Sequence, residues 1–318
     1  MAGSREIKRK IKSIKSTKQI TRAMELVSAS KMKKAVSNAV SIRPYAANAM
    51  VVLTHISEKT DPNLHPFLQK REPKNCLVLM ISPDRGLCGG LNAALIKKAI
   101  SFEKEFKATH PKCNLMYIAA GKKAESFLAR TGRNLIASYS GLNNHPSLKE
   151  ILSINKLISD YYKSGEADIV FIIYQHFISP LVQKPAVHQL LPFSRESMIE
   201  MGASLGLFGE NAQFDSQNGI SNASAANAKF EVAEYKFEPS ASFVLDNLLP
   251  GLIEMQIYHA LLESVASEHS ARMVAMRNAT ENANEMIDGL TLLFNQNRQA
   301  SITREIAEIS AGKVALGL

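Results

Sequence analysis

Residues 273–301 read MVAMRNATENANEMIDGLTLLFNQNRQAS, and one stripe of this stretch repeats at alternating steps of three and four. This spacing is the heptad period of a coiled-coil seam. The stripe is poor in leucine and rich in small and polar residues, so it allows close approach but gives a weaker coil than a leucine zipper. It consists of Met273, Met276, Thr280, Ala283, Ile287, Leu290, Phe294, Asn297 and Ser301.

The stripe lies inside a longer helical segment, residues 240–318. No strong turn signal follows Pro250 and Gly251 before residue 312. A helix of roughly 70 residues would be about 105 Å long at 1.5 Å per residue. A small domain is narrower than that, so most of this helix needs a partner outside an ordinary core. The candidate partner is the other helical end of the chain.

That other end, residues 1–58, reads as a second long helix beginning near Glu6, with Ser4 as a plausible N-cap. Pro44 removes a backbone donor and crowds the preceding turn, so we expect a bend or a break there. Pro62, Pro66 and Pro73 then indicate a linker. Apolar residues at helical spacing predict a face formed by Ile7, Ile11, Ile14, Ile20, Met24 and Val27.

The positive charge of the chain is concentrated in this first helix. Residues 1–34 contain eleven lysines and arginines but only Glu6 and Glu25 as acids, so they carry the whole chain's excess of +9. A basic helix implies an acidic partner, which is a nucleic acid, an anionic membrane or an acidic protein surface. Nucleic acid is disfavoured because no aromatic residue that could stack on bases precedes Tyr45.

The composition of the chain indicates the cellular compartment in which the protein works. The three cysteines, Cys76, Cys88 and Cys113, form no CxxC motif, and the charged N-terminus lacks the apolar region of a signal peptide. No run of about 18 apolar residues occurs that could span a membrane. We therefore expect a reduced, cytosol-facing compartment and no transmembrane segment.

The middle of the chain, residues 74–237, changes to strands alternating with helices, which predicts an α/β domain with a largely parallel sheet. Pro185 suggests that the last strand is at an edge. Residues 193–229 lose all periodicity and are expected to form a flexible insertion, followed by a weak strand at 230–237. The main predicted strands are 76–81, 115–119, 169–174 and 182–191, and the predicted helices are 91–107, 122–130 and 147–163.

Two motifs suggest catalysis but do not match its requirements. The turn Gly86-Leu87-Cys88-Gly89-Gly90 is neither GxGxxG nor a P-loop, so we interpret it as a tight strand-to-helix turn that could be presented to a partner. The GxSxG match at 202–206 lies in the aperiodic segment, without the strand and helix that a nucleophile elbow needs.

The eight histidines show no metal-ligand spacing, and Glu268-His269 is interpreted as a polar flank of the seam. The sequence predicts no catalytic residue, cofactor site or metal site.

Four separated segments resemble the gamma subunit of bacterial F-type, rotary ATP synthase. The resemblance runs from end to end; the 193–229 insertion is longer than usual and lacks the cysteines of the chloroplast relatives. The four segments are 11–32 (IKSIKSTKQITRAMELVSASKM), 82–92 (SPDRGLCGGLN), 267–276 (SEHSARMVAM) and 298–312 (RQASITREIAEISAG).

The resemblance implies that the terminal helices form a long antiparallel coiled coil beside a central Rossmann-like α/β domain. It implies a central-stalk rotor without an active site, whose coil enters an alpha3beta3 hexamer and whose foot contacts epsilon and the c-ring at a bacterial inner membrane. Tyr235 is expected near epsilon and the c-ring. The residues expected to contact a beta subunit are Lys31, Lys33, Lys34, Asp84, Arg85, Cys88, Arg272, Gln299 and Thr303.

Two alternatives remain open at this stage. One is an enzyme that uses the glycine-rich turn, which would bind a nucleotide as an isolated chain. The other is a nucleic-acid or membrane-surface binder that acts through the basic helix, whose binding would depend steeply on salt.

Overall fold

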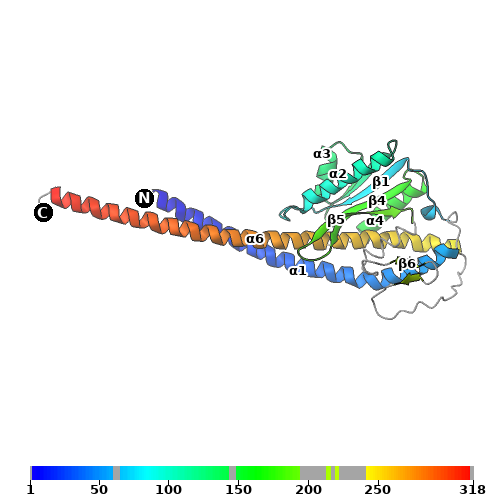
Figure 1. Cartoon of the computed structure of the whole chain (residues 1–318), viewed down its shortest axis with the longest axis horizontal. Coiled ribbons are helices and arrows are strands. Elements are labelled where there is room, and N and C mark those ends of the chain that lie inside the picture. Colours follow the sequence, from blue (N-terminus) through cyan, green and yellow to red (C-terminus); the bar gives the residue numbers. More distant parts are fainter. Residues whose placement is uncertain are drawn as a thin grey trace. The chain divides into compact units, whose positions relative to one another are not determined.

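The computed structural model describes residues 2–59, 65–142, 148–193, 213–215, 219–221 and 241–315 (Figure 1). The chain divides into two compact units. We call Met1–Ser30 with Arg272–Leu318 the coil unit, and Lys31–Ala271 the sheet unit. Among the described helices, none has an apolar stretch long enough to cross a membrane.

Two long helices run through both units. Helix α1 spans Ala2–Lys59, and helix α6 spans Ala241–Ala315 with 75 residues. Of the bend or break expected at Pro44, the break is wrong, because α1 continues through that residue. A proline removes a single backbone donor, and the turns on both sides keep their own hydrogen bonds. Pro250 likewise lies inside α6, where its carbonyl accepts a hydrogen bond of 3.0 Å from Asn155 Nδ2.

The predicted seam of α6 is confirmed in the coil unit. Met276, Thr280 and Ala283 are buried, and Met273, Ile287, Leu290, Phe294 and Ser301 are half-buried, whereas Asn297 is exposed.

The predicted apolar face of α1 is right at its start and only partly right farther along. Ile7, Ile11, Ile14 and Met24 are half-buried, but Ile20 and Val27 are exposed. From Ile14 onward the buried stripe keeps heptad steps and therefore passes through polar residues. These seam residues are Lys18, Thr21, Glu25 and Ser28.

The sheet unit contains a five-stranded sheet in the order β3-β2-β1-β4-β5. β1 to β4 are parallel, whereas β5 is an antiparallel edge strand in which Pro185 lies opposite Gln175, as predicted. β3 was not predicted, because four of its residues are only half-buried, Ser138 is exposed, and the strand gives a short, weak signal. The strands are β1 Asn75–Ile81, β2 Asn114–Ala120, β3 Leu135–Tyr139, β4 Ile169–Phe177 and β5 Gln183–Leu191.

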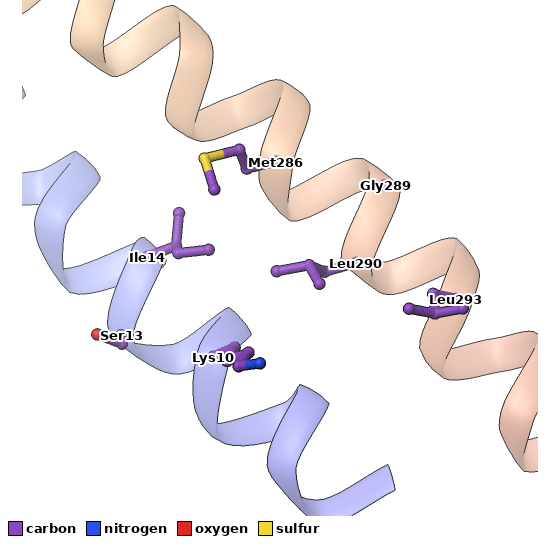
Figure 2. A pocket seen from close by; sticks show the side chains of 7 residues that line it. All are labelled: Lys10, Ser13, Ile14, Met286, Gly289, Leu290 and Leu293. Carbon is purple, nitrogen blue, oxygen red and sulfur yellow. The ribbon is translucent and has the colours of Figure 1, made fainter. Parts of the chain in front are cut away.

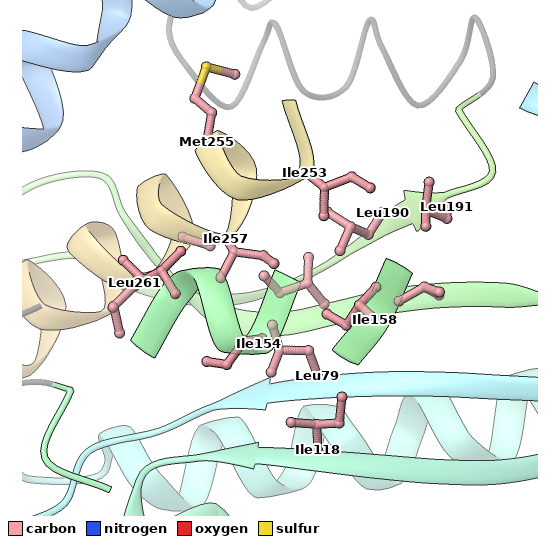
Figure 3. Packing of buried hydrophobic residues seen from close by; sticks show 14 of the residues in the cluster. Leu79, Ile118, Ile154, Ile158, Leu190, Leu191, Ile253, Met255, Ile257 and Leu261 are labelled. Atoms are coloured by element: carbon pink, nitrogen blue, oxygen red, sulfur yellow. The ribbon is translucent and has the colours of Figure 1, made fainter. Parts of the chain in front are cut away.

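Helices cover both faces of this sheet. α2 (Leu91–Thr109) and α3 (Lys122–Arg130) cover one face, and α4 (Leu148–Lys163) with the inner part of α6 covers the other (Figure 1). Alternate residues of β1 enter opposite cores, so Val78 packs with α2 and α3 while Leu79 packs with α4 and α6. In Figure 3, residues of α6 such as Ile257 and Leu261 meet α4 over the sheet. The predicted α/β class with a mainly parallel sheet is confirmed.

Shorter elements lie between these. The predicted linker contains a 3-10 turn, η2 (Pro66–Leu68), whose Phe67 is fully buried. Within the expected aperiodic insertion, β6 (Gln213–Asp215) and β7 (Gly219–Ser221) form a two-stranded antiparallel sheet. The weak strand predicted at 230–237 lies outside the described residues.

Candidate partner-binding surfaces

The loop after β1, residues 82–90, is held in place by hydrogen bonds to distant segments. Ser82 Oγ accepts from the Ala124 amide at 2.7 Å. Asp84 uses both carboxylate oxygens, because Oδ1 accepts from the Lys122 amide and Oδ2 from the Gly141 amide, each at 3.0 Å. The loop is therefore fixed to the first turn of α3 and to the segment after β3.

Three of the predicted contact residues lie in this loop, but they differ in access. Asp84 is bound within the sheet unit as described above. Arg85 is exposed, whereas Cys88 is buried and its Sγ accepts from Asn92 Nδ2 at 3.3 Å. Arg85 is thus the most accessible of the three, and Asp84 and Cys88 shape the loop from inside.

Sequence reasoning missed Leu87, which is the loop's most exposed apolar side chain. It is 63% exposed and has a φ of 63°. A leucine rarely adopts this left-handed conformation, since its Cβ crowds the following carbonyl. The only sequence signal was the placement of a large apolar residue among glycines, which could have indicated an outward-facing turn.

The predicted basic cluster, Lys31, Lys33 and Lys34, lies on α1 in the sheet unit. All three lysines are exposed, whereas Met32 and Ala35 between and beside them are buried. None of the three forms an ion pair with a described side chain. The charge of this cluster is therefore available to an acidic partner.

The predicted contacts on α6 do not form one cluster. Arg272 is only 7% exposed, whereas Gln299 and Thr303 are exposed one helical turn apart. The Arg272-to-Gln299 separation corresponds to about 40 Å along a helix. Beyond Ser301 every described side chain of α6 is exposed, including Ile302, Ile306 and Ile309. This end of α6 thus presents polar and apolar side chains together.

The coil unit also has a shallow groove of about 490 Å³ between its two helices, shown in Figure 2. An added Cβ at Gly289 would have no atom within 4 Å, so the missing side chain leaves open space in the groove. The groove is mainly apolar and is suited to a protruding apolar side chain. It is lined by Lys10, Ser13, Ile14, Met286, Gly289, Leu290 and Leu293.

A polar cluster lies where α6 meets β4 in the sheet unit. His176 Nδ1 is 2.7 Å from Glu263 Oε2, and His259 Nε2 is 3.7 Å from Glu263 Oε1. The hydrogen bond and charge of Glu263 raise the pKa of His176 despite its partial burial. The nearby Glu268 and His269 are buried, so their predicted position on a polar flank of the seam is wrong. These groups attach α6 to the sheet.

Groups typical of catalysis are sparse in the described part of the chain. It contains no group of three or more histidine, cysteine or acidic side chains that could hold a metal ion. Cys76 and Cys113 are buried, and burial raises the pKa of both thiols, which disfavours a reactive thiolate. The GxSxG segment and Tyr235 lie outside the described residues.

Comparison with known proteins covers the whole chain. The family model described as ATP synthase matches residues 3–316. The chain is 40% identical to the ATP synthase gamma chain of Pasteurella multocida over 317 residues, covering 99% of this chain and 100% of the relative. It is 42% identical to the ATP synthase gamma chain of Pelotomaculum thermopropionicum, with the same coverage.

Solved structures share the fold at lower identity. A chain of the Euglena gracilis mitochondrial ATP synthase (OSCP/F1/c-ring) aligns with a TM-score of 0.62 and 16% identity, covering 99% of this chain and 95% of that chain. A chain of the Tetrahymena thermophila mitochondrial ATP synthase (central stalk/c-ring) aligns with a TM-score of 0.54 and 24% identity, covering 82% and 99%.

Proposed function

Because the chain belongs to the ATP synthase gamma-chain family, it is a central-stalk subunit of the rotary enzyme, and we propose that it is the shaft that couples two rotating parts. In this role, proton-driven rotation of a c-ring turns the chain. The turning chain changes the conformation of the catalytic beta subunits. It thereby also regulates ATPase activity and proton flow.

Coupling of this kind is a free energy that links rotation angle to nucleotide affinity. Each angle of an asymmetric shaft favours a different beta conformation. The relation is reciprocal, so ATP binding turns the shaft and turning the shaft releases ATP. The exposed end of α6 beyond Ser301 supplies an asymmetry, since one helix continues there without the pairing seen at Thr21 and Thr280.

The observation that carries the proposal is the continuity of α6. Its outer part forms the coil unit with α1, and its inner part forms the core of the sheet unit with α4. No loop interrupts the helix between the two units. A continuous hydrogen-bonded helix transmits twist better than two elements joined by a flexible connection would.

The partners follow from this role. We propose that the coil enters an alpha3beta3 hexamer, and that the sheet unit contacts epsilon and the c-ring, with Tyr235 near that contact. The residues proposed to contact beta are Lys31, Lys33, Lys34, Asp84, Arg85, Cys88, Arg272, Gln299 and Thr303. Of these, the exposed lysines, Arg85, Gln299 and Thr303 are accessible for direct contact. Asp84, Cys88 and Arg272 would support the contact surface from within.

We further propose that the chain performs no chemistry and needs no cofactor, and that catalysis takes place on the beta subunits. The chain would then lie at the cytoplasmic face of a bacterial inner membrane, held there only through the complex. Its basic residues would bind acidic surfaces of protein partners and would not bind nucleic acid. Membership of the family supports these proposals. The raised pKa values of the Cys76 and Cys113 thiols support only the proposal that the chain performs no thiol chemistry.

Co-purification tests the function directly. The tagged full-length chain, expressed with the other subunits of its own complex, should be recovered with three alpha and three beta chains per copy. It should show ATPase activity only in that assembly. Recovery of the chain alone, or ATP turnover by the isolated chain, would overturn the proposal.

A further inference from the structure

Three serines recur at every third residue of α6 in the sheet unit. They are Ser264, Ser267 and Ser270, and each is at most 3% exposed. Residues three apart lie on the same side of a helix. The stretch from Glu263 to Ser270 is buried throughout, yet Val265 and Ala266 are its two apolar members. Polar groups therefore make much of the contact between α6 and the sheet in this stretch.

Each of these buried hydroxyls is bonded to the backbone of β4 or of the turn that follows it. Ser264 Oγ accepts from the Gln175 amide at 3.2 Å, and Ser267 Oγ donates to the Gln175 carbonyl at 3.3 Å. Ser270 Oγ donates to the Pro180 carbonyl at 2.6 Å. We call Ser264, Ser267 and Ser270 the serine ladder.

The backbone of Gln175 needs these partners because neighbouring strands do not supply them. Gln175 is only 1% exposed, and the paired register of β1 and β4 ends before it, with Met80 opposite Ile173. On β5 the residue opposite Gln175 is Pro185, which has no amide hydrogen to donate. A buried amide or carbonyl without a partner is costly. The serine ladder thus completes the hydrogen bonding of β4 where β1 has ended.

Glu263 adds a bond of a second kind beside the serine ladder. Its Oε2 is 2.7 Å from Nδ1 of His176, the residue that follows Gln175. Two consecutive residues of α6 are therefore bonded to two consecutive residues of β4. A shift of α6 by one residue would move it by about 1.5 Å and break both contacts. These bonds fix one register between the helix and the strand.

Hydrogen bonds also resist a rotation that apolar contacts oppose less strongly. Apolar burial is not directional, so residues such as Ile257 and Leu261 chiefly hold α6 against the sheet (Figure 3). A hydrogen bond weakens steeply when it is bent or stretched. Turning α6 by roughly 25° moves its Cα atoms by about 1 Å, given a helix radius of about 2.3 Å. That movement would break the bonds of Ser264 and Ser267.

The position of the serine ladder suits the transfer of torque. The sheet unit ends on α6 at Ala271, directly after Ser270. The strand that the ladder binds, β4, lies between β1 and β5 in the sheet. The ladder therefore joins α6 to an inner strand next to the point where the helix leaves the unit.

We propose that the serine ladder sets the torsional stiffness of the link between α6 and the sheet, an inference that rests on the proposed function. Its three serines are positioning residues, which hold the angle of the helix and contact no substrate. The packing around them shares the load. Loss of the three hydroxyls leaves the helix in place but lets it turn more freely against β4.

Angular fluctuation in the assembled complex tests this inference. The catalytic subunits are fixed to a surface, and a bead is attached to the sheet unit through Lys104→Cys, an exposed position on α2. Replacing all three serines by alanine should raise the angular variance of the bead during pauses at least about twofold, because directional bonds that oppose rotation are lost. An unchanged variance would overturn the inference.

Two control variants separate torsional stiffness from general stability. Val78→Ala weakens the opposite face of the sheet, which packs with α2 and α3. Ser159→Ala removes a buried hydroxyl whose bond to Asn155 Oδ1, at 3.3 Å, stays within α4. Both should leave the angular variance unchanged. A rise in either control equal to that of the triple variant would show that stiffness follows overall stability, and would overturn the inference.

Hydrogen exchange of the full-length chain supplies a local test that needs no assembly. Ser264→Ala leaves the Gln175 amide without its partner, so this amide should exchange at least about tenfold faster, whereas Ser159→Ala should not change it. Equal protection in both variants would reject the ladder. If the unchanged chain assembles and rotates but the ladder variants behave like it, the ladder fails while the rotor function stands. If the unchanged chain does not assemble, the proposed function itself fails.

Discussion

The hydroxyl oxygens of Thr21 and Thr280 lie 2.7 Å apart across the seam of the coil unit, and both side chains are buried. Each hydroxyl is also near a carbonyl of its own helix, Lys18 for Thr21 at 3.0 Å and Met276 for Thr280 at 2.8 Å. A hydroxyl has one proton, so one threonine donates to the other and the second donates to its backbone carbonyl. A buried polar pair of this kind fixes the register of a seam that has few bulky residues.

Replacing one threonine of this pair by valine should destabilise the coil unit by about 1 kcal/mol, because the remaining hydroxyl loses a buried partner. Replacing both should cost less than the sum of the two single changes. Hydrogen exchange of α1 and α6 amides in the two single variants and the double variant measures this coupling. Strict additivity would show that the two hydroxyls do not interact.

Two glycine-to-alanine changes should have opposite effects. Gly289→Ala should stabilise the coil unit by about 1 kcal/mol, since the helix gains a better former and the new Cβ meets no atom within 4 Å. Gly121→Ala should destabilise the sheet unit by about 3 kcal/mol or more, because φ is +111° and the Cβ would lie 1.9 Å from the Ser82 carbonyl oxygen. Thermal unfolding by circular dichroism distinguishes the two, and equal effects would contradict this account.

The two helices of the coil differ in how far their sequences predict the seam. In α6 the buried stripe holds Met276, Ala283 and half-buried apolar residues, so periodicity indicates it. In α1 the buried stripe passes through Thr21 and Ser28, while the apolar Ile20 is exposed. Hydrophobic periodicity cannot locate a seam made of small polar residues, because their burial depends on the partner helix.

His176 should make the sheet unit more stable at low pH than at high pH. The hydrogen bond of Glu263 raises the pKa of His176, so the folded protein holds the proton to higher pH than the unfolded chain does. This stabilisation is complete below the unfolded value of about 6.5 and is lost as pH rises through the folded pKa. Against His176→Asn, the unchanged protein should show its larger advantage in unfolding free energy at about pH 6 and its smaller one at about pH 9. His259→Asn is the control for the second imidazole near Glu263.

His65 should make the sheet unit less stable at low pH than at high pH, which is the opposite of the effect of His176. Burial lowers the pKa of His65 against the opposing charge of Asp246, and its Nδ1 accepts from the Phe67 amide at 3.1 Å. The fold therefore favours the neutral ring, and stability should fall as pH drops from about 6.5 through the folded pKa. His65→Asn, which retains an acceptor for Phe67, should remove this loss. An NMR titration in which His65 protonates at or above the ordinary histidine value would contradict the prediction.

Charge reversal of Lys31, Lys33 and Lys34 to Glu should lower coupled ATP synthesis and ATPase activity in the assembled complex without unfolding the isolated chain. The exposed lysines form no ion pair with a described side chain, so their loss removes little intramolecular energy. A matched reversal at the exposed Lys97, Lys104 and Lys112 controls for total charge. Equal turnover and coupling in both triple variants would remove the proposed role of the cluster.

The sequence predicted a strand-to-helix loop at residues 82–90, but it could not predict which of its side chains face outward. Asp84 was expected to meet a partner, yet its two oxygens bind amides of Lys122 and Gly141, which lie far along the chain. Leu87 faces outward with a positive φ, in a loop that these distant bonds hold in place. Local propensity contains no information about such bonds. The positions of β1, β2 and β4, by contrast, followed from short apolar runs whose burial is set by their own composition.

Twelve consecutive residues of α6, from His259 to Ser270, are buried, so the helix is enclosed on every side over roughly 18 Å. If the chain works as a shaft, the twisting moment passes between sheet unit and helix along this whole length. The load is then shared among many side chains, and no single one bears it. A truncation at any one of these positions would soften the connection without letting the helix slip.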